Sequence, residues 1–304
     1  MPTRTISWSE IDCFRQCPFK HELTYKQRWT KPAEEGTALY RGTLFHSVME
    51  NHYNRLKILK APGLTDEEKV DQSAQYLANI WDLLSLGDLD AQSEEQSLVK
   101  WMLDGYCEKW DFDDEWEILE VEHADEFWLP TDKGTRSTFK IKMKIDLLVK
   151  HKATGKVWIV DHKSGKELPT DKMLELNDQF ALYVWGKRQR GLDVQGAIHN
   201  ACRSFRYKDQ SKPYPLDTRF KRTMLYRTDA ELQTVAIEAY KTMRRAYAIK
   251  PGEAERSPNE DTCRWRCNFT EDCLGSRKQP LDKQAVYINR SLKLHGFEQN
   301  FTRH

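Results

Sequence analysis

Between residues 116 and 163 the sequence alternates apolar and polar side chains over three successive segments. These are WEILEVEHADEFWL, FKIKMKIDLLV and VWIVDHK, and the turn-prone runs TDKGT and KATGK separate them. A period of two is typical of β-strands, whose successive side chains point to opposite faces of a sheet. The sequence therefore predicts three antiparallel strands.

Helical patterns precede these segments. The run GTLFHSVMENHYNRLKIL, residues 42–59, has apolar residues at helical spacing. Residues 65–110 continue this pattern, with TDEE as a capping signal and with Gly87 and Gly105 as expected breaks. Because this second stretch carries no motif, we interpret it as a helical insert.

Further elements are expected at both ends of the chain. SWSE, residues 7–10, has the pattern of a capping box, in which Ser7 and Glu10 satisfy the first amide groups of a short helix. After the three strands we expect a helix over 171–190, a strand in VQGAIHNACRSF, and a last helix over 228–249 that starts at TDAE.

Composition limits the class of protein. The chain of 304 residues has 39% hydrophobic residues, no apolar stretch long enough to span a bilayer and no signal-like segment, so we expect a globular protein of the cytosol. With 48 basic and 47 acidic residues, net charge neither favours nor excludes nucleic acid, and local patches must decide. Seven cysteines in such a protein do not indicate a disulfide framework.

The segment VWIVDHKSGKE places an aspartate and a lysine on one face of a strand. Asp161 and Lys163 point to one side, and Val160 and His162 point to the other. A solvated strand end with a surface ion pair is the simplest interpretation, so the rest of the chain must show whether the pair has chemistry to perform.

A second carboxylate lies on the preceding strand. Asp146 shares a face with Lys140, Lys142 and Lys144, which form either a solvated row or a track for a phosphate backbone. If the two strands pair through KATGK, Asp146 and Asp161 converge as oxygen ligands for Mg²⁺ or Mn²⁺. Such an ion polarises a phosphate and generates hydroxide, and Lys163 would orient the attacking water.

The order of these motifs resembles a known family. A helix with GTLFH, a strand ending in ID, a strand with IVDHKSG and a helix with Q-x-x-x-Y together resemble the PD-(D/E)XK nuclease superfamily, in its RecB-like branch. The resemblance implies an α/β restriction-endonuclease-like core, with a mixed central sheet flanked by helices. It also implies metal binding by His46, Asp146 and Asp161, catalysis by Lys163, and supporting roles for Gln179 and Tyr183.

Two residues qualify this resemblance. Lys144 stands where RecB-like sequences often have glycine, two residues before the aspartate. Glu122, on the first strand, is a further carboxylate that could join the site, although a structural or solvent-facing role is favoured.

The segment CRWRCNFTEDC places Cys263, Cys267 and Cys273 within eleven residues. Cys17 is the candidate for a fourth thiolate, and Cys13 is a weaker substitute one helical turn away. Four thiolates can hold a tetrahedral Zn²⁺ or an iron–sulfur cubane, and the spacing does not separate these alternatives. The resemblance implies a 4Fe-4S cluster that ties the chain ends together, whereas Cys107 and Cys202 are interpreted as small hydrophobic residues.

The resemblance implies a metal-dependent DNA nuclease, either an exonuclease or a single-strand endonuclease, in recombination, repair or replication. Its partners would be DNA and a helicase or recombination protein; the alternatives are an inactive DNA-binding module and a zinc-stabilised interaction module. Candidate DNA contacts are Lys140, Lys142, Lys144, Arg203, Arg206 and Tyr207. The expected parts are an N-terminal segment (1–32), a helical region with the motif histidine (33–116), the nuclease core (117–250), the cysteine cluster (251–275) and a polar tail (276–304).

Overall fold

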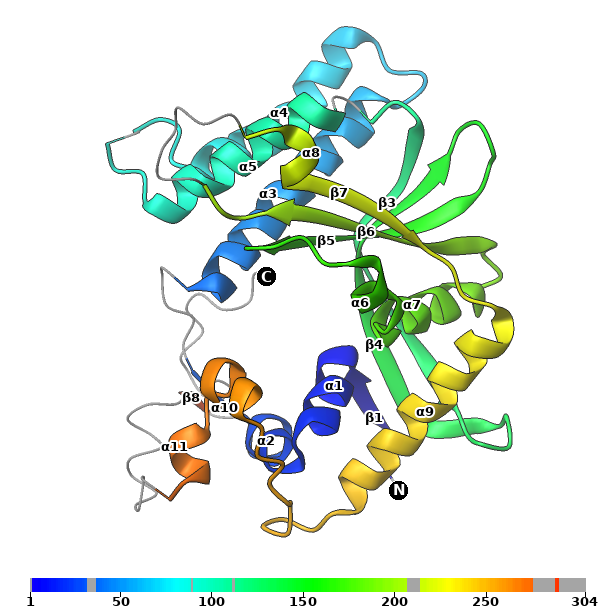
Figure 1. Ribbon diagram of the computed structural model, residues 1–304. Coiled ribbons are helices and arrows are strands. Elements are labelled where there is room, and N and C mark those ends of the chain that lie inside the picture. The colour runs from blue at the N-terminus through cyan, green and yellow to red at the C-terminus, as the bar shows by residue number, and fades with distance from the viewer. Residues whose placement is uncertain are drawn as a thin grey trace. The chain divides into compact units, whose positions relative to one another are not determined.

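The computed structural model describes residues 2–31, 37–88, 90–110, 113–206, 214–275 and 288–289 (Figure 1). The chain divides into two compact units. The first comprises residues 1–33, 126–143 and 236–304, and the second comprises residues 34–125 and 144–235. In the described residues, none of the helices is both long enough and apolar enough to cross a membrane.

A mixed sheet organises the second unit. The far half of β4 (Arg136–His151) runs antiparallel to β5 (Val157–Gly165), which is parallel to β6 (Val194–Arg203), and β6 is antiparallel to β7 (Phe220–Leu225). The strand β3 (Trp116–Pro130) pairs with β4. The three strands expected from the alternation are therefore present, whereas β7 was not foreseen.

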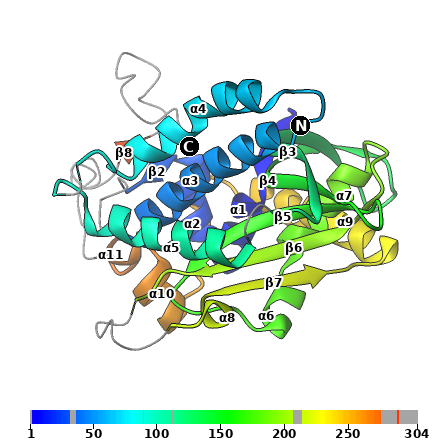
Figure 2. The ribbon, with the colours of Figure 1, turned by 90° about the horizontal axis from the view of Figure 1, so that it is seen from above.

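Helices α3 (Ala38–Leu59) and α5 (Glu94–Trp110) lie over one face of the sheet formed by β5, β6 and β7, and α4 (Asp66–Leu83) packs against α3 (Figure 2). The expected capping signal at TDEE is confirmed, because the side chains of Thr65 and Glu68 each accept from the other residue's backbone amide. The expected break at Gly105 is wrong. This glycine lies inside α5, where the guanidinium of Arg219 occupies the space that a Cβ would need.

The helix expected over 171–190 is in fact two helices, α6 (Asp171–Glu175) and α7 (Asp178–Arg188). Asn177 separates them because its backbone is extended and its side-chain oxygen accepts from the amide of Gln179, which starts a new helix. The short helix α8 (Leu216–Arg219) precedes β7.

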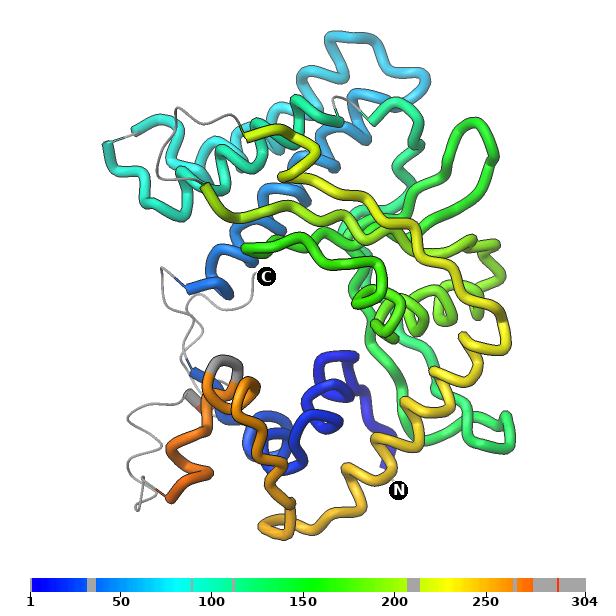
Figure 3. Tube along the Cα trace, viewed as in Figure 1, coloured from blue at the N-terminus to red at the C-terminus, as the bar shows by residue number. Residues whose placement is uncertain are grey.

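The first unit contains the two ends of the chain. The strand β1 (Arg4–Ser7) is parallel to the near half of β4 and leads into α1 (Trp8–Gln16), α2 (Pro18–His21) and the π-helical turn η1 (Glu22–Lys26). The helix α9 (Asp229–Ala248) leads to α10 (Glu260–Arg266) and α11 (Thr270–Cys273), while β2 (Trp29–Thr30) pairs with β8 (Ile288–Asn289). Figure 3 shows α2 beside the segment before α10, where the Phe19 amide donates to the Glu255 carbonyl.

The capping box expected at SWSE is only half formed. The Ser7 side chain accepts from the amide of Glu10, as predicted, but the Glu10 carboxylate bonds to His21 Nε2 at 3.0 Å and to Tyr247 Oη at 2.7 Å. Buried tertiary partners therefore draw this carboxylate away from the helix end. The TDAE box at the start of α9 is complete, with Thr228 and Glu231 bonded reciprocally. Most of the polar tail, residues 276–287 and 290–304, lies outside the described residues.

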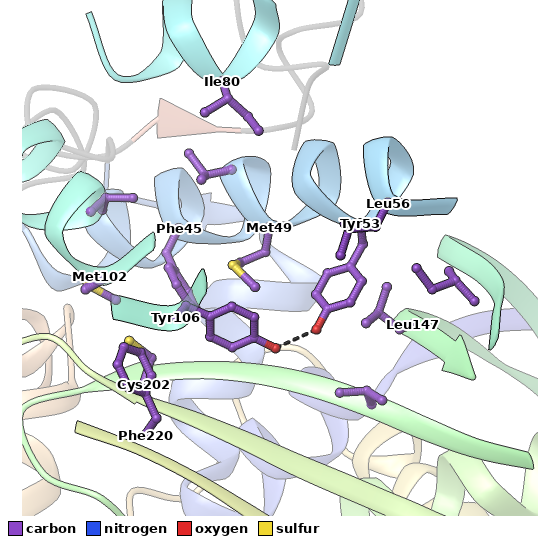
Figure 4. Close-up of a cluster of buried hydrophobic side chains, with 14 of the residues drawn as sticks. Phe45, Met49, Tyr53, Leu56, Ile80, Met102, Tyr106, Leu147, Cys202 and Phe220 are labelled. Atoms are coloured by element: carbon purple, nitrogen blue, oxygen red, sulfur yellow. Dashed lines mark hydrogen bonds between the residues drawn. The ribbon is translucent and has the colours of Figure 1, made fainter. Parts of the chain in front are cut away.

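The core of the second unit lies between α3, α5 and the sheet. Figure 4 shows Phe45, Met49, Tyr53 and Leu56 projecting from α3 toward Leu147, Met102, Tyr106 and Phe220, and all of these side chains are buried. The face of α3 that carries them follows the apolar periodicity in the sequence. This packing fixes the position of α3, and hence of His46, above the sheet.

Two glycines provide a test of this packing. Gly196 faces Trp158 across β5 and β6, and a Cβ there would lie 3.1 Å from the Trp158 ring and clash with the Leu225 carbonyl. Gly196→Ala should therefore lower the free energy of unfolding by ~1–3 kcal/mol. The control is Gly42→Ala in α3, where the new methyl meets nothing within 4 Å, and this change should raise stability by ~0.5–1 kcal/mol. Urea unfolding measures both; equal stability of the Gly196 variant and the wild type would contradict the described β5–β7 packing.

Candidate active site

The site is built on the paired strands β4 and β5. The register Leu147↔Val160, continued by one residue, places Asp146 beside Asp161. Both carboxylates are largely buried, at 8% and 3% exposure. Asp146 Oδ2 accepts the backbone N–H of His162 at 2.6 Å, which fixes this carboxylate relative to β5. The structure thus brings together the two aspartates that the alternation placed at neighbouring positions.

His46 and Glu122 complete a group around Asp146. His46 Nδ1 lies 3.4 Å from Asp146 Oδ2. The ligand atoms of His46, Glu122 and Asp146 all lie within 4.8 Å of one another, a spacing that a single metal ion could bridge. These residues come from α3, β3 and β4, so the group forms only in the folded chain.

Glu122 shows a feature that the sequence did not reveal. Its side chain is only 10% exposed, so the solvent-facing interpretation was wrong. Glu122 has a left-handed φ of 50°, which interrupts the alternation of β3, and its carboxylate lies 2.5 Å from Lys144 Nζ. Lys144, the residue that departs from the RecB-like pattern, therefore neutralises this additional carboxylate. One signal of this pair was present in the sequence: an additional carboxylate at Glu122 occurs together with a lysine at position 144, where the RecB-like pattern often has glycine.

Electrostatics favour a charged pair at His46 and Asp146. Burial opposes ionisation of Asp146, but the adjacent His46 outweighs it and lowers the pKa of Asp146 to about 2. Burial likewise opposes protonation of His46, yet the Asp146 carboxylate raises the pKa of the imidazole. In Asp161 burial dominates and raises the pKa of the carboxyl, although Lys163 opposes the shift.

Lys163 lies next to this group. Its Nζ is 2.6 Å from Asp161 Oδ2, and its side chain is still 41% exposed. Burial of the ammonium disfavours its charge, but Asp161 and Asp146 outweigh that effect and raise the pKa of Lys163. On α7, Gln179 Nε2 donates to Tyr183 Oη at 3.1 Å, and burial raises the pKa of Tyr183 to about 12. The charged Lys163 and the neutral Tyr183 are thus available as donors.

The donor set suits a hard divalent cation. Carboxylate oxygens with one imidazole are ligands for Mg²⁺ or Mn²⁺. Asp161 Oδ2 is buried and pairs with Lys163 Nζ at 2.6 Å. A carboxylate has more lone pairs than this one contact uses, so the residues present fit an oxygen-ligated cation.

Comparison with known proteins identifies the family. The family model of the PD-(D/E)XK nuclease superfamily matches residues 5–274, which includes all the residues of this site. The chain belongs to the PD-(D/E)XK nuclease superfamily.

Two solved structures are similar to this chain at low sequence identity. A crystal structure of a proposed exonuclease from Eubacterium rectale is 15% identical, with a TM-score of 0.48 over 88% of this chain and 87% of that one. The crystal structure of SSO0001 is also 15% identical, with a TM-score of 0.36 over 91% and 89% of the two chains. These scores are too low to carry an argument. No curated protein matches the sequence.

A second group of acidic residues is already neutralised by cations of the protein. Glu120, His123 and Asp125 also offer ligand atoms within 4.8 Å. However, the buried ammonium of Lys187 lies 2.5 Å from Glu120 Oε2 and 2.7 Å from Asp125 Oδ2, and Arg190 pairs with Asp125 as well. Protein cations therefore already neutralise this group, which joins α7 to β3 instead of offering a metal site.

Some of the candidate DNA contacts already pair with other groups of the protein, and others do not. Lys140 pairs with Glu126 and Lys144 with Glu122, whereas Lys142 is exposed and forms no ion pair with any described residue. The Arg203 side chain donates to the Lys166 carbonyl just beyond β5. Arg206 turns inward to the Ser97 carbonyl and the Trp101 ring, and Tyr207 lies outside the described residues.

All four cysteines proposed as ligands line one cavity in the first unit. Its volume is about 490 Å³, and Cys17, Cys263, Cys267 and Cys273 all contribute to its wall. Cys13, the weaker substitute, is buried outside this lining, and burial raises the pKa of its thiol to about 11. Cys17 is thus the better placed of the two N-terminal candidates.

The raised pKa of His46 gives a pH-dependent prediction. A cation must displace the proton that Asp146 helps His46 to retain, so Mn²⁺ affinity should fall as pH is lowered through the raised pKa. Isothermal titration calorimetry in buffers of different ionisation enthalpy would measure the protons released. In His46→Gln binding should be weaker overall, and one proton-linked step should be lost. An identical pH profile in the variant would show that His46 is not a ligand.

Proposed function

We propose that the chain is a metal-dependent deoxyribonuclease of the RecB-like branch, acting on DNA ends or single strands. The observation that carries this proposal is the convergence of His46 and Asp146, with Asp161 and Lys163 on the adjacent strand. Three of these side chains offer metal ligands, and the fourth is a cation at the same site. That combination suits phosphodiester hydrolysis better than DNA binding alone.

Each residue then has a distinct role. Asp146 and His46 would hold Mg²⁺ or Mn²⁺, and Glu122 would add a carboxylate from β3. Asp161, which lies beside Asp146 on the adjacent strand, would complete the ligand set. The bound ion would polarise the scissile phosphate and lower the pKa of its water. Lys163 would orient the attacking water and stabilise negative charge developing on the phosphate. Gln179 would hold the Tyr183 hydroxyl beside Lys163.

The fold of the site also suggests where the substrate runs. Lys140, Lys142 and Lys144 alternate along β4 with core residues, on the face that Asp146 occupies. Among the described candidate contacts, Lys142 and Lys144 are exposed and Arg203 is half-buried. Lys142, which forms no ion pair with any described residue, would neutralise backbone phosphates most readily. Partner proteins would be a helicase or recombination protein, and the cytosol is the expected compartment.

Two substitutions test the catalytic assignment. Lys163→Met and Asp161→Asn should each lower the rate of DNA cleavage by ~100–1000-fold. The first removes a cation that would stabilise charge at the phosphate, and the second removes a carboxylate that would hold the metal ion. The assay uses end-labelled linear and circular DNA, single- and double-stranded, with Mg²⁺ or Mn²⁺. The control is Lys156→Met, which removes an exposed ammonium that pairs with Asp193 at the surface and should cleave at the wild-type rate.

DNA binding measured in Ca²⁺ should persist in both site variants, which separates catalysis from affinity. Full cleavage by either variant would reject these roles. Binding by the wild type without cleavage of any of these substrates would favour the inactive DNA-binding module.

We further propose that the four cysteines of the cavity hold a 4Fe-4S cluster. Tetrahedral zinc, with Zn–S bonds of about 2.3 Å, brings its sulfurs to about 3.8 Å from one another. Among the described residues, the groups of three or more ligand atoms within 4.8 Å contain no cysteine. A cubane binds one thiolate at each iron and holds the sulfurs farther apart. The four thiols line a cavity of about 490 Å³ and form no compact tetrahedral set among the described residues, which supports the cluster over zinc.

The amide of Asn259 supports this assignment, because it donates to Cys263 Sγ at 3.4 Å. Such N–H···S contacts stabilise thiolate ligands of iron–sulfur clusters. The cluster would cross-link α2 to α10 and α11 under reducing conditions, where a disulfide would not persist.

The two N-terminal cysteines, one helical turn apart, form a matched pair for a test. Cys17→Ser should lose iron and melt at a lower temperature, because one ligand is missing and the closure between chain ends opens. Cys13→Ser should retain iron, since this residue does not line the cavity. Iron analysis and visible absorption of anaerobically purified protein measure the outcome. Wild-type iron content in Cys17→Ser, or stoichiometric zinc in the wild type, would reject the cluster.

A further inference from the structure

Behind the catalytic face of the sheet runs a row of polar side chains. His162, Asn200 and Arg222 are lateral neighbours across β5, β6 and β7. They point to the face opposite Asp161 and Lys163, because successive strand residues alternate. His162 and Asn200 are each only 2% exposed, so this is a polar row inside the core that α3 and α5 cover.

Asn200 connects this row to the aromatic core. Its Nδ2 donates to Tyr106 Oη at 2.6 Å and lies 2.9 Å from His162 Nδ1. Tyr106 Oη in turn lies 2.5 Å from Tyr53 Oη, the contact drawn in Figure 4. The His162 ring stacks on Tyr53, with centroids 5.3 Å apart and planes at 28°. The imidazole is therefore held both at its edge and across its face.

A buried ion pair ends the network. Arg222 binds Asp113 in bidentate fashion, with N···O distances of 2.7 and 2.8 Å, and stacks over Trp110 at 3.9 Å. Tyr53 Oη donates to the same carboxylate at 2.6 Å, and Arg222 also donates to Tyr106 Oη at 2.8 Å. A buried ion pair of this kind is a weak source of stability, since desolvation offsets much of its attraction. The ion pair instead fixes the positions of the Tyr53 and Tyr106 hydroxyls, which it contacts.

His162 transmits this restraint to the proposed active site. Its ring belongs to the network, while its backbone N–H donates to Asp146 Oδ2 at 2.6 Å. It also lies between Asp161 and Lys163 in the chain. A shift of the His162 backbone that follows displacement of its ring would move the amide that orients Asp146 and the neighbouring residues Asp161 and Lys163.

We propose that this network sets the spacing of the metal ligands from behind the sheet, and that Asn200 is its positioning residue. The proposal rests on the proposed function, because it concerns how the ligands of that site are held. Outer-shell partners of metal ligands commonly change metal affinity or activity by ~10–100-fold when they are removed. Asn200 acts one step farther out, through the main chain.

The experiment separates positioning from stability. Asn200→Leu keeps a similar volume but removes both hydrogen bonds, and Tyr106→Phe removes one hydroxyl and leaves the ring in place. The control is Leu84→Ala, which deletes a fully buried side chain of the same core that is not part of the polar network. For each variant, calorimetry measures Mn²⁺ binding, thermal denaturation measures stability, and steady-state cleavage of one end-labelled oligonucleotide gives kcat and KM.

We expect Asn200→Leu to bind Mn²⁺ ~10-fold or more weakly and to lose kcat with little change in the KM for DNA. Tyr106→Phe should show the same pattern to a smaller extent and serves if Asn200→Leu does not fold. Leu84→Ala should lose stability but bind Mn²⁺ as the wild type does.

Three outcomes would overturn the inference. Wild-type Mn²⁺ affinity in both network variants would show that the ligands are positioned independently of it. A loss of affinity in Leu84→Ala as large as in Asn200→Leu would show that the network contributes stability alone. A wild-type protein that neither binds Mn²⁺ nor cleaves DNA would overturn the proposed function together with this inference, which distinguishes that failure from the first two.

Discussion

The alternation of side chains along β5 is the constraint on which the second unit depends. Asp161 and Lys163 must point to one face and His162 to the other, because a strand allows no other arrangement. One face supplies the charged group of the site, and the other inserts an imidazole into a buried polar row. Contacts on both faces of the sheet therefore fix the register of β5. A register shift of one residue would move Asp161 and Lys163 to the buried face and His162 to the face of the site.

Charges at the site are paired in a way that leaves room for a cation. Asp146 faces His46, Asp161 faces Lys163, and Glu122 faces Lys144. Each partner reduces the penalty of burying a carboxylate. None of these pairs closes the site, because His46 remains partly exposed and its proposed role is to exchange its proton for a metal ion. By contrast, Lys187 saturates Glu120 and Asp125, which is why a similar set of ligand types has a different character.

Local patterns in the sequence predicted several features that local interactions decide. The strand alternation, the boxes at Thr65 and Thr228, and the motif order that led to the family are of this kind. Several failures have one physical cause, because the deciding partner is distant in sequence, whereas the break at Asn177 comes from a local cap that the periodicity did not indicate. Gly105 continues a helix because Arg219 packs against it, and Glu10 leaves its cap for His21 and Tyr247. Glu122 approaches His46 and Asp146 at a left-handed backbone angle that no periodicity encodes.

The two proposed metal sites use ligands of opposite chemical character. His46, Glu122, Asp146 and Asp161 offer mainly carboxylate oxygen, which prefers hard ions such as Mg²⁺ and Mn²⁺. All four proposed ligands in the cysteine cavity are thiolates, and thiolates bind iron–sulfur clusters, zinc or copper most readily. Mg²⁺ or Mn²⁺ would therefore not replace a lost cluster at the thiolates, and a cluster would not replace the ion at the carboxylates. The cavity would act as a structural closure of the chain ends, and the exchangeable ion would remain at the carboxylates, where catalysis requires it.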